Sequence, residues 1–383
     1  MNNQILIYSH ELHHIGTIFT IFPAVFQNCT LDIERAKFHS SSVLFLSFNL
    51  IKQPSPALFK YFEIYNHRKS NGLPTKIIID YSLEGICSTI ECEILFKEHN
   101  IKFEDVLFVN NTLVANQFPD YDFKQHITFD HHSLDAYSKC IFTAKNRVDS
   151  TLVKDRPNAL NLLIGKLKTK YSRFLTSYYF YKCDLLDNSV LGIHASPEDI
   201  LNMMKLHPEY DDINFYNKII TCLGPADSVS IIQETNEGLT ATAGGWPFDP
   251  AIFKNSSISY VCETYDIDKG NFPYLLTEKT YRAIINKHPF VIQSSPGQLN
   301  SVKSLGYETF SSIIDETYNE YTALDYSHVE KTVLAAKDFV HKLPNNLDKV
   351  QEIVDYNYKH WLTSSKTEYD KTLVYLNNFI NNI

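Results

Sequence analysis

The sequence predicts an α/β protein with two doubly wound domains and a helical C-terminal region. Short apolar runs alternate with segments of helical period, this alternation restarts once, and it then gives way to mostly helical period. Alternating strands and helices are typical of parallel sheets that carry helices on both faces. We therefore expect an N-terminal domain at residues 1–136, a second domain at 137–326, and C-terminal helices at 327–383 that pack back on the domains.

In the N-terminal domain, five apolar runs are expected to form strands. They lie at residues 4–9, 42–48, 76–80, 105–112 and 126–130, with helices beginning at Ser55 and Glu84. Ser55 can cap the first helix, Pro56 suits its first turn, and Gly72 follows its end.

A strand at 139–145 and a helix near Pro157 are expected to open the second domain. The helix is inferred from Leu160, Ile164 and Leu167, which share one helical face. The other expected elements are strands at 174–181, 229–235, 258–264 and 290–294 and a capped helix from Ser196.

Composition and charge exclude several classes of protein. The 383 residues are 44% hydrophobic, so the chain can form cores and is not expected to be disordered. The formal net charge of −9 disfavours a general nucleic-acid coat. The seven cysteines are scattered without a CxxC pair, which indicates a reducing compartment. No apolar run reaches the roughly 20 residues of a membrane span, and we expect a cytoplasmic protein.

One segment departs from the overall negative charge. Residues 145–173 hold eight basic residues against two acidic ones. A solvated helix face accounts for the lysines within 166–170. Lys154 and Arg156 instead precede the helix expected near Pro157, where backbone N–H groups favour an anion. For Arg156 the sequence therefore allows either a phosphate contact or a position on a solvated face.

Residues 277–310 carry the most informative pattern, TEKTYRAIINKHPFVIQSSPGQLNSVKSLGYETF. Thr277 can cap a helix whose first two residues are Glu278 and Lys279. A carboxylate in this place can accept both hydroxyls of a ribose, while the ammonium and the helix dipole hold a diphosphate. The SSPG turn at 294–297 follows a strand, and open α/β sheets bind ligands at the carboxyl ends of their strands.

This pattern resembles the C-terminal donor-binding segment of GT-B-type glycosyltransferases, especially phage and viral proteins with an (S/T)EKT(F/Y)…PF…SPG…LGF-TF pattern. Its TEK element is also similar to that of the fucosyltransferases. The segment DRPNALNLLIGKL at 155–167 looks like a degraded form of the basic, proline-containing opening of the same domain, in which Arg156 and Pro157 fit. The resemblance implies two Rossmann-like domains and a nucleotide-sugar donor. The donor contacts that it implies come from Thr277, Glu278, Lys279, Ser295, Pro296, Gly297 and Arg156.

The loop after the first expected strand carries the sequence HELHH. In a GT-B acceptor domain this loop faces the cleft, where a histidine or carboxylate can act as general base for the acceptor hydroxyl. The candidates for that base are Glu11, His13 and His14. Further acceptor-side candidates are Gly16, Asp80 and Glu84. A first-turn carboxylate of a helix accounts equally well for Glu84.

Two motifs allow metal chemistry as an alternative. HELHH fits HExxH, with His10 and His14 as zinc ligands and Glu11 as base, but no third ligand follows at metzincin spacing. The DHH at 130–132 is similar to a phosphoesterase signature whose partner motifs are not evident.

We expect a metal-independent glycosyltransferase, a hexosyl- or pentosyltransferase without a cofactor, that moves a sugar from a nucleotide-sugar to a hydroxyl acceptor. The resemblance to phage proteins suggests DNA that carries a hydroxymethylpyrimidine, and the host cytoplasm if the chain is phage-encoded. A saccharide or protein acceptor is the alternative. The alternatives from other classes are a zinc-dependent hydrolase that uses HELHH and a non-catalytic binding protein with a GT-B fold.

Overall fold

The computed structural model describes residues 6–8, 21–22, 25, 29–30, 33–40, 42–47, 56–80, 89–111, 126–130, 133–134, 136–138, 152–157, 160–167, 170–223, 251–263, 276–321 and 326–382. The chain forms two compact units. The first unit comprises residues 1–143, 240–246 and 364–383, and the second comprises 144–239 and 247–363.

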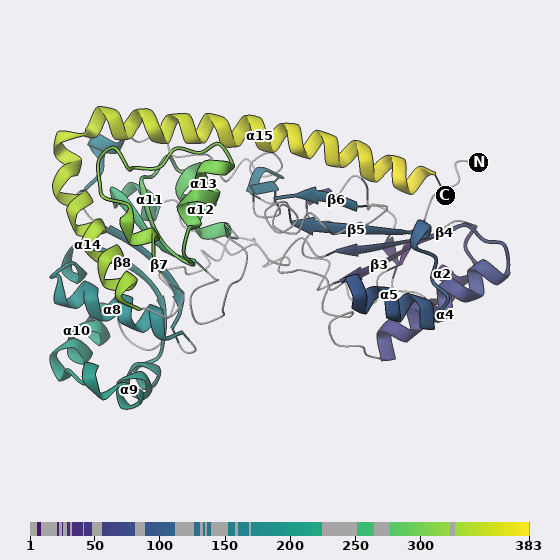
Figure 1. Cartoon of the computed structure of the whole chain (residues 1–383), viewed down its shortest axis with the longest axis horizontal. Coiled ribbons are helices and arrows are strands. Elements are labelled where there is room, and N and C mark those ends of the chain that lie inside the picture. Colours follow the sequence, from purple (N-terminus) through teal and green to yellow (C-terminus); the bar gives the residue numbers. More distant parts are fainter. Residues whose placement is uncertain are drawn as a thin grey trace. The chain divides into compact units, whose positions relative to one another are not determined.

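The first unit is built on a six-stranded parallel sheet with strand order β2-β1-β3-β4-β5-β6 (Figure 1). The strands are β1 (Leu6–Tyr8), β2 (Cys29–Thr30), β3 (Ser42–Ser47), β4 (Thr75–Asp80), β5 (Val106–Asn111) and β6 (His126–Phe129). The helices are α2 (Ile33–Phe38), α4 (Pro56–Ser70) and α5 (Thr89–Glu98), and a 3-10 turn, η2 (Phe103–Asp105), precedes β5. The order reverses between β1 and β3, which is the topological switch point of this sheet.

The second unit is built on a four-stranded parallel sheet with strand order β10-β9-β7-β8. The strands are β7 (Leu160–Lys166), β8 (Ser189–His194), β9 (Ile258–Cys262) and β10 (Phe290–Gln293). The helices are α8 (Tyr171–Lys182), α9 (Pro197–Leu206), α10 (Ile213–Leu223), α11 (Ala251–Lys254), α12 (Glu278–Ile285) and α13 (Gln298–Ser304). Short 3-10 turns lie at Val153–Asp155, Leu186–Asn188, Pro208–Tyr210 and Thr317–Asn319. Here the switch point lies between β7 and β9.

These two parallel sheets, each with one reversal of strand order, confirm the predicted doubly wound α/β class. The predicted helical C-terminus is also confirmed, as α14 (Ser327–Lys342), a 3-10 turn at Leu343–Asn345, and α15 (Leu347–Asn381). Among the helices that the structure describes, none is both long enough and apolar enough to cross a lipid bilayer.

Two predictions at the start of the second unit are wrong, and they are wrong in opposite senses. The segment expected to be a helix near Pro157 continues into strand β7, and the strand expected at 174–181 is helix α8. The run LNLLIGK fits the apolar pattern of a buried helix as well as that of a strand. A parallel strand that is covered on both faces is apolar along its length, so periodicity does not distinguish the two. In α8, the Thr176 and Ser177 hydroxyls donate to carbonyls one turn earlier, at 2.8 and 3.1 Å, which satisfies these polar groups inside a buried helix.

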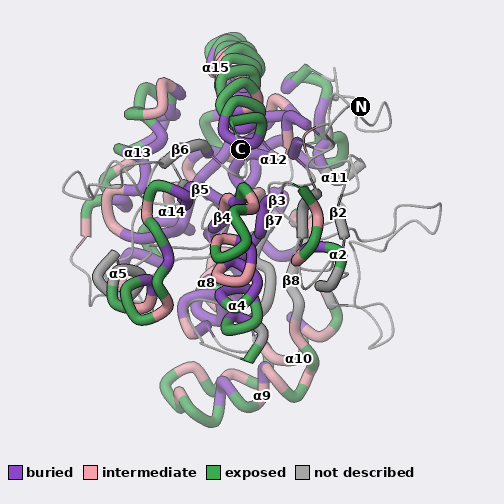
Figure 2. Tube along the Cα trace, turned by 90° about the vertical axis from the view of Figure 1, so that its right-hand side faces the viewer, coloured by how far each residue is buried: buried purple, intermediate pink, exposed green. Residues whose placement is uncertain are grey.

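The core of the first unit forms where α4 packs on its sheet. Leu58, Tyr61, Phe62 and Tyr65 recur at helical spacing on α4 and are each at most 1% exposed. They belong to one apolar cluster with buried residues of β3, β4 and β5. Figure 2 colours the buried stretches of the chain purple. Packing of α4 on the sheet through this cluster holds the short strands together.

Helix α15 contributes to both units. Its first part belongs to the second unit, where Trp361 is fully buried. Its later part belongs to the first unit, where Tyr369 stacks on Phe22 with ring centroids 4.8 Å apart. In the same part the hydroxyls of Ser365 and Ser133 are hydrogen-bonded at 2.7 Å. The first unit is therefore completed by residues from the end of the described chain.

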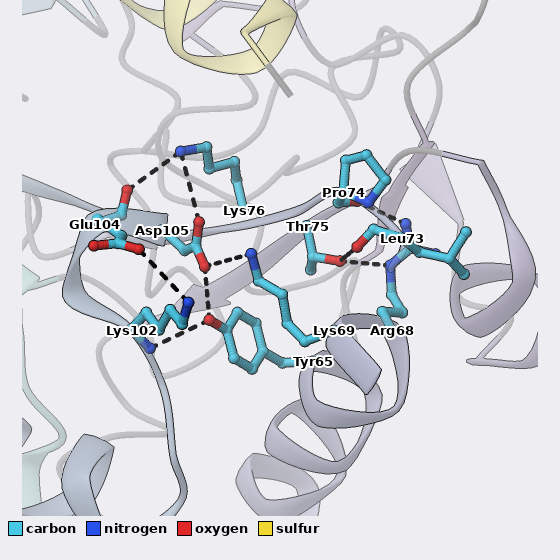
Figure 3. Close-up of polar contacts among 10 residues, drawn as sticks. All are labelled: Tyr65, Arg68, Lys69, Leu73, Pro74, Thr75, Lys76, Lys102, Glu104 and Asp105. Atoms are coloured by element: carbon cyan, nitrogen blue, oxygen red, sulfur yellow. Dashed lines mark hydrogen bonds and ion pairs between the residues drawn. The ribbon is translucent and has the colours of Figure 1, made fainter. Parts of the chain in front are cut away.

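The amino edge of the first sheet is held by two buried charged residues (Figure 3). Asp105 accepts a hydrogen bond of 2.7 Å from Tyr65 and an ion pair of 2.6 Å from Lys69. Arg68 is fully buried and donates to the carbonyls of Ala36, Lys37, His39 and Pro74 and to the Thr75 hydroxyl. Burial lowers the pKa of Arg68 to about 10, so the guanidinium is still charged at neutral pH. These contacts tie α4 to α2, to the start of β4 and to the turn before β5, which indicates a structural role.

The substitution Arg68→Met is expected to lower the free energy of unfolding by about 3 kcal/mol or more, because it leaves several buried carbonyls without a donor. Urea-induced unfolding measures this change. The control is Lys60→Met on the exposed face of the same helix, which should change stability by no more than about 0.5 kcal/mol. Equal effects of the two substitutions would contradict this role of Arg68.

Candidate functional site

The carboxyl edge of the second sheet gathers the polar groups that the sequence pattern singled out. Helix α8 begins after β7, Glu263 directly follows β9, and the turn Ser294–Gly297 follows β10. Strands β7 and β9 are the neighbours between which the strand order reverses. Ligands of open parallel sheets bind at such a point, because the loops on its two sides diverge.

The amino end of α12 presents the predicted acid–base pair. Thr277 caps the helix, and its hydroxyl accepts the Lys279 backbone N–H at 3.4 Å. The Lys279 ammonium and the Glu278 carboxylate form an ion pair of 3.1 Å, with side chains 13% and 25% exposed. The structure thus brings Thr277, Glu278 and Lys279 together in the first turn of one helix, where the dipole favours negative charge.

A buried carboxylate that the sequence reasoning missed lies beneath this turn. Glu263 is 1% exposed. It accepts hydrogen bonds from the Thr277 backbone N–H at 3.1 Å, from the Thr277 hydroxyl, and from the Thr280 hydroxyl at 2.5 Å. Its position in the sequence was the available signal for a buried acid. Glu263 directly follows the apolar strand β9, which is buried along its whole length, and a charged group in such a place needs hydrogen-bond partners.

Two buried cations flank the switch point. Lys170 and Arg173, at the start of α8, are 9% and 5% exposed. Arg173 donates to the Glu263 carbonyl at 3.2 Å, which places its guanidinium beside the carboxyl end of β9. The interpretation of Lys170 as part of a solvated helix face is therefore wrong. The sequence pattern predicted a helix before Lys170, but this segment is strand β7. Lys170 and Arg173 therefore follow a strand and lie at the carboxyl edge of the sheet.

The SSPG turn ends β10 and begins α13. Gly297 has φ = 78°, a left-handed conformation that a residue without a Cβ adopts readily, and its N–H donates to the Asn319 carbonyl at 3.0 Å. Ser295 is buried, whereas Pro296 is intermediate in exposure. The Ser295 hydroxyl and the Gln298 side-chain amide nitrogen are buried without a hydrogen-bond partner among the described residues. The turn therefore holds hydrogen-bonding groups that the described part of the chain does not satisfy.

Arg156 does not join this group. Its guanidinium donates to the carbonyls of Asn286 and Lys287, at 2.9 and 3.2 Å, so it lies at the carboxyl end of α12 and not at the amino end with Glu278. The element that follows it is strand β7, so the helix N-terminus on which its predicted phosphate contact depended does not exist. A cation at a helix C-terminus stabilises the helix, which is a structural role.

The acceptor-side candidates are only partly described. Asp80 is buried and ends β4, at the carboxyl edge of the first sheet as predicted. Glu11, His13, His14, Gly16 and Glu84 lie outside the described residues.

The metal motifs find no support in the described part of the chain. HELHH lies outside it, as do His131 and His132. Asp130, the remaining residue of DHH, is buried and accepts the Ser133 backbone N–H at 3.1 Å, as a helix-capping residue does. Among the described residues, no group of three or more His, Cys, Asp and Glu side chains is arranged to hold a metal ion.

Comparisons with known proteins give structural similarity at low sequence identity. No protein-family model and no curated protein sequence matches the chain. The crystal structure of α,α-trehalose 6-phosphate synthase from Burkholderia multivorans is similar with a TM-score of 0.43 and 10% identity, over 96% of this chain and 80% of that chain. The UDP-forming α,α-trehalose-phosphate synthase from Burkholderia vietnamiensis gives a TM-score of 0.41 and 9% identity, over 94% and 83%. Both TM-scores lie below 0.5, where a shared fold is not established.

The substitution Thr277→Val is expected to lower the free energy of unfolding by about 2 kcal/mol, because it removes both the helix cap and a hydrogen bond to a buried carboxylate. Thr277→Ser keeps the hydroxyl and should cost less than about 1 kcal/mol. Urea-induced unfolding compares the two variants. Equal stability of the serine and valine variants would show that the hydroxyl does not hold α12.

Proposed function

We propose that the chain is a GT-B-type glycosyltransferase that binds its nucleotide-sugar donor at the carboxyl edge of the second sheet. The observation that carries this proposal is the Glu278–Lys279 pair, held at the capped amino end of α12 beside the switch point of a parallel sheet. The resemblance of the TEKT…SPG segment to donor-binding segments supports the same assignment.

Each group in the first turn of α12 suits one part of a nucleotide-sugar. The Glu278 carboxylate is the more exposed of the pair and can accept both ribose hydroxyls. The Lys279 ammonium and the backbone N–H groups of the turn are donors for the diphosphate. The Ser295 hydroxyl and the Gln298 amide nitrogen, which are buried without a partner among the described residues, lie in the turn after β10 at the same edge of the sheet.

In the proposed reaction, the bond between the sugar anomeric carbon and the diphosphate oxygen breaks while an acceptor oxygen bonds to that carbon. The nucleoside diphosphate leaves with the bonding electron pair, and the acceptor hydroxyl gives its proton to a base. Lys279, with the positive potential of Lys170 and Arg173, stabilises the charge of the leaving group. These cations supply the charge neutralisation for which other transferases use a metal ion, so we propose a metal-independent reaction.

For the general base we propose Glu11, His13 or His14. They follow β1 in the sequence, and β1 ends at Tyr8 beside the switch point of the first sheet. Asp80 ends β4 at the carboxyl edge of the same sheet and belongs to this acceptor side, for which Gly16 and Glu84 are also proposed.

A DNA acceptor carrying hydroxymethylpyrimidine gains no support from the described part of the basic segment. Arg156, Lys170 and Arg173 are buried and do not form a surface for a phosphate backbone, whereas Lys154 is exposed. Saccharide and protein hydroxyls fit the proposed chemistry equally well. The dependence of transfer on salt separates the classes, because only binding to DNA releases many counterions and weakens steeply with added salt.

The double substitution Glu278→Ala/Lys279→Ala is expected to weaken donor binding by about 100-fold or more, because two charge-assisted contacts are lost. Calorimetric titration with a panel of nucleotide-sugars measures this. The matched control is Glu330→Ala/Lys331→Ala, an adjacent Glu–Lys pair on the exposed face of α14, which should leave the affinity unchanged.

Three outcomes discriminate between the functions. Unchanged affinity in the α12 variant would overturn this donor site, and a wild-type chain that binds no nucleotide-sugar would overturn the proposed function. Binding without hydrolysis or transfer would indicate a non-catalytic binding protein.

A further inference from the structure

We infer that Glu263 is a positioning residue for the donor, and that it acts through Thr277 on Lys279. This inference rests on the proposed function for its ligand, but the contacts that carry it belong to the chain alone. Glu263 is buried and touches the capping residue of α12, whereas Glu278 and Lys279 are the residues that the donor would contact.

Glu263 completes a capping arrangement that is normally local. In α9, the Ser196 hydroxyl accepts the Asp199 N–H while the Asp199 carboxylate accepts the Ser196 N–H, so one turn of helix caps itself. In α12, the residue at the corresponding third position is Thr280, which has no carboxylate. Glu263 supplies it from the end of β9 and accepts the N–H of the capping Thr277 at 3.1 Å.

The difference matters because it connects α12 to the sheet. A local capping box fixes a helix end only relative to itself, whereas Glu263 fixes the start of α12 relative to the carboxyl end of β9. The Thr280 hydroxyl donates to the same carboxylate at 2.5 Å, and Arg173 donates to the Glu263 carbonyl at 3.2 Å. The first turn of α12 is thereby held beside the switch point.

The direction of these hydrogen bonds also sets the role of Thr277. Because its hydroxyl donates to Glu263, the lone pairs of Oγ1 remain available as acceptors. They face the backbone nitrogen and the ammonium of Lys279, each at 3.4 Å. A carboxylate at position 263 cannot donate in return, so this order cannot reverse. The Lys279 ammonium is thus held between Thr277 Oγ1 and Glu278 Oε1, at 3.4 and 3.1 Å.

The substitution Glu263→Gln tests this order with little change of shape. A glutamine amide can donate to Thr277 Oγ1, where it competes with Lys279. We expect the dissociation constant for the nucleotide-sugar to rise about 10-fold, while Glu263→Asp, which is too short to reach both threonines, should not rescue binding. The control is Asp105→Asn, because Asp105 is a buried carboxylate of the first unit that likewise accepts a side-chain hydroxyl, that of Tyr65. It should reduce stability and leave the dissociation constant unchanged.

A double-mutant cycle shows whether Glu263 acts through Lys279. In a Lys279→Met background, Glu263→Gln should change the dissociation constant by less than about 2-fold, because the group that it positions is absent. A further 10-fold rise in that background, or an equal rise in Asp105→Asn, would overturn the inference in favour of a general effect of stability.

Hydrogen exchange provides a readout that needs no donor. In Glu263→Gln the backbone amides of residues 277–281 should exchange at least about 10-fold faster than in the wild type, while the first turn of α9 is unaffected. Unchanged exchange at 277–281 would overturn the positioning role itself. A wild-type chain that binds no nucleotide-sugar, but shows this faster exchange in the variant, would overturn the proposed function and leave Glu263 as a structural anchor of α12.

Discussion

The hydrogen bonds that Glu263 accepts from Thr277 and Thr280 are the contacts on which the candidate site depends. A parallel sheet supplies a place where loops diverge, but it does not fix what those loops present there. Here a carboxylate from a strand end enters the cap of the following helix, so the acid–base pair of that helix inherits its position from the sheet. Because Glu263 is buried, breaking its hydrogen bonds to Thr277 or Thr280 would leave polar groups without water as a substitute partner. This cost opposes movement of the first turn of α12.

The buried positive charges of the second unit differ in role because they lie at different ends of α12. Arg156 donates to carbonyls at the carboxyl end of α12, where a cation complements the helix dipole. Lys170 and Arg173 lie near the opposite edge, where they add positive potential to the amino end of α12. Basic residues therefore lie near both ends of α12 and have a different role at each end. The net charge of −9 is a sum over the whole chain and does not describe the field inside this site.

How far the sequence predicts the structure depends on whether the determinants are local. The cap at Thr277, the strand before the SSPG turn and the capped helix from Ser196 follow from residues close together in the sequence, and each is present. The swap of helix and strand around β7 and α8 arose because burial on both faces removes the difference between the two periods. The position of Glu263 after an apolar strand was a signal, but its partners could not be assigned from sequence, since Thr277 lies 14 residues later.

The division of α15 between the units has a consequence for the order in which the chain can fold during synthesis. The first unit needs residues 364–383, but its main segment is complete at residue 143. Ribosomes add about 5–20 residues per second, so this unit waits on the order of 10–50 s for the last part of α15. Throughout that interval Tyr369 cannot cover Phe22 or Tyr137. The second unit, whose segments are made in between, can form its own sheet before the first unit is closed.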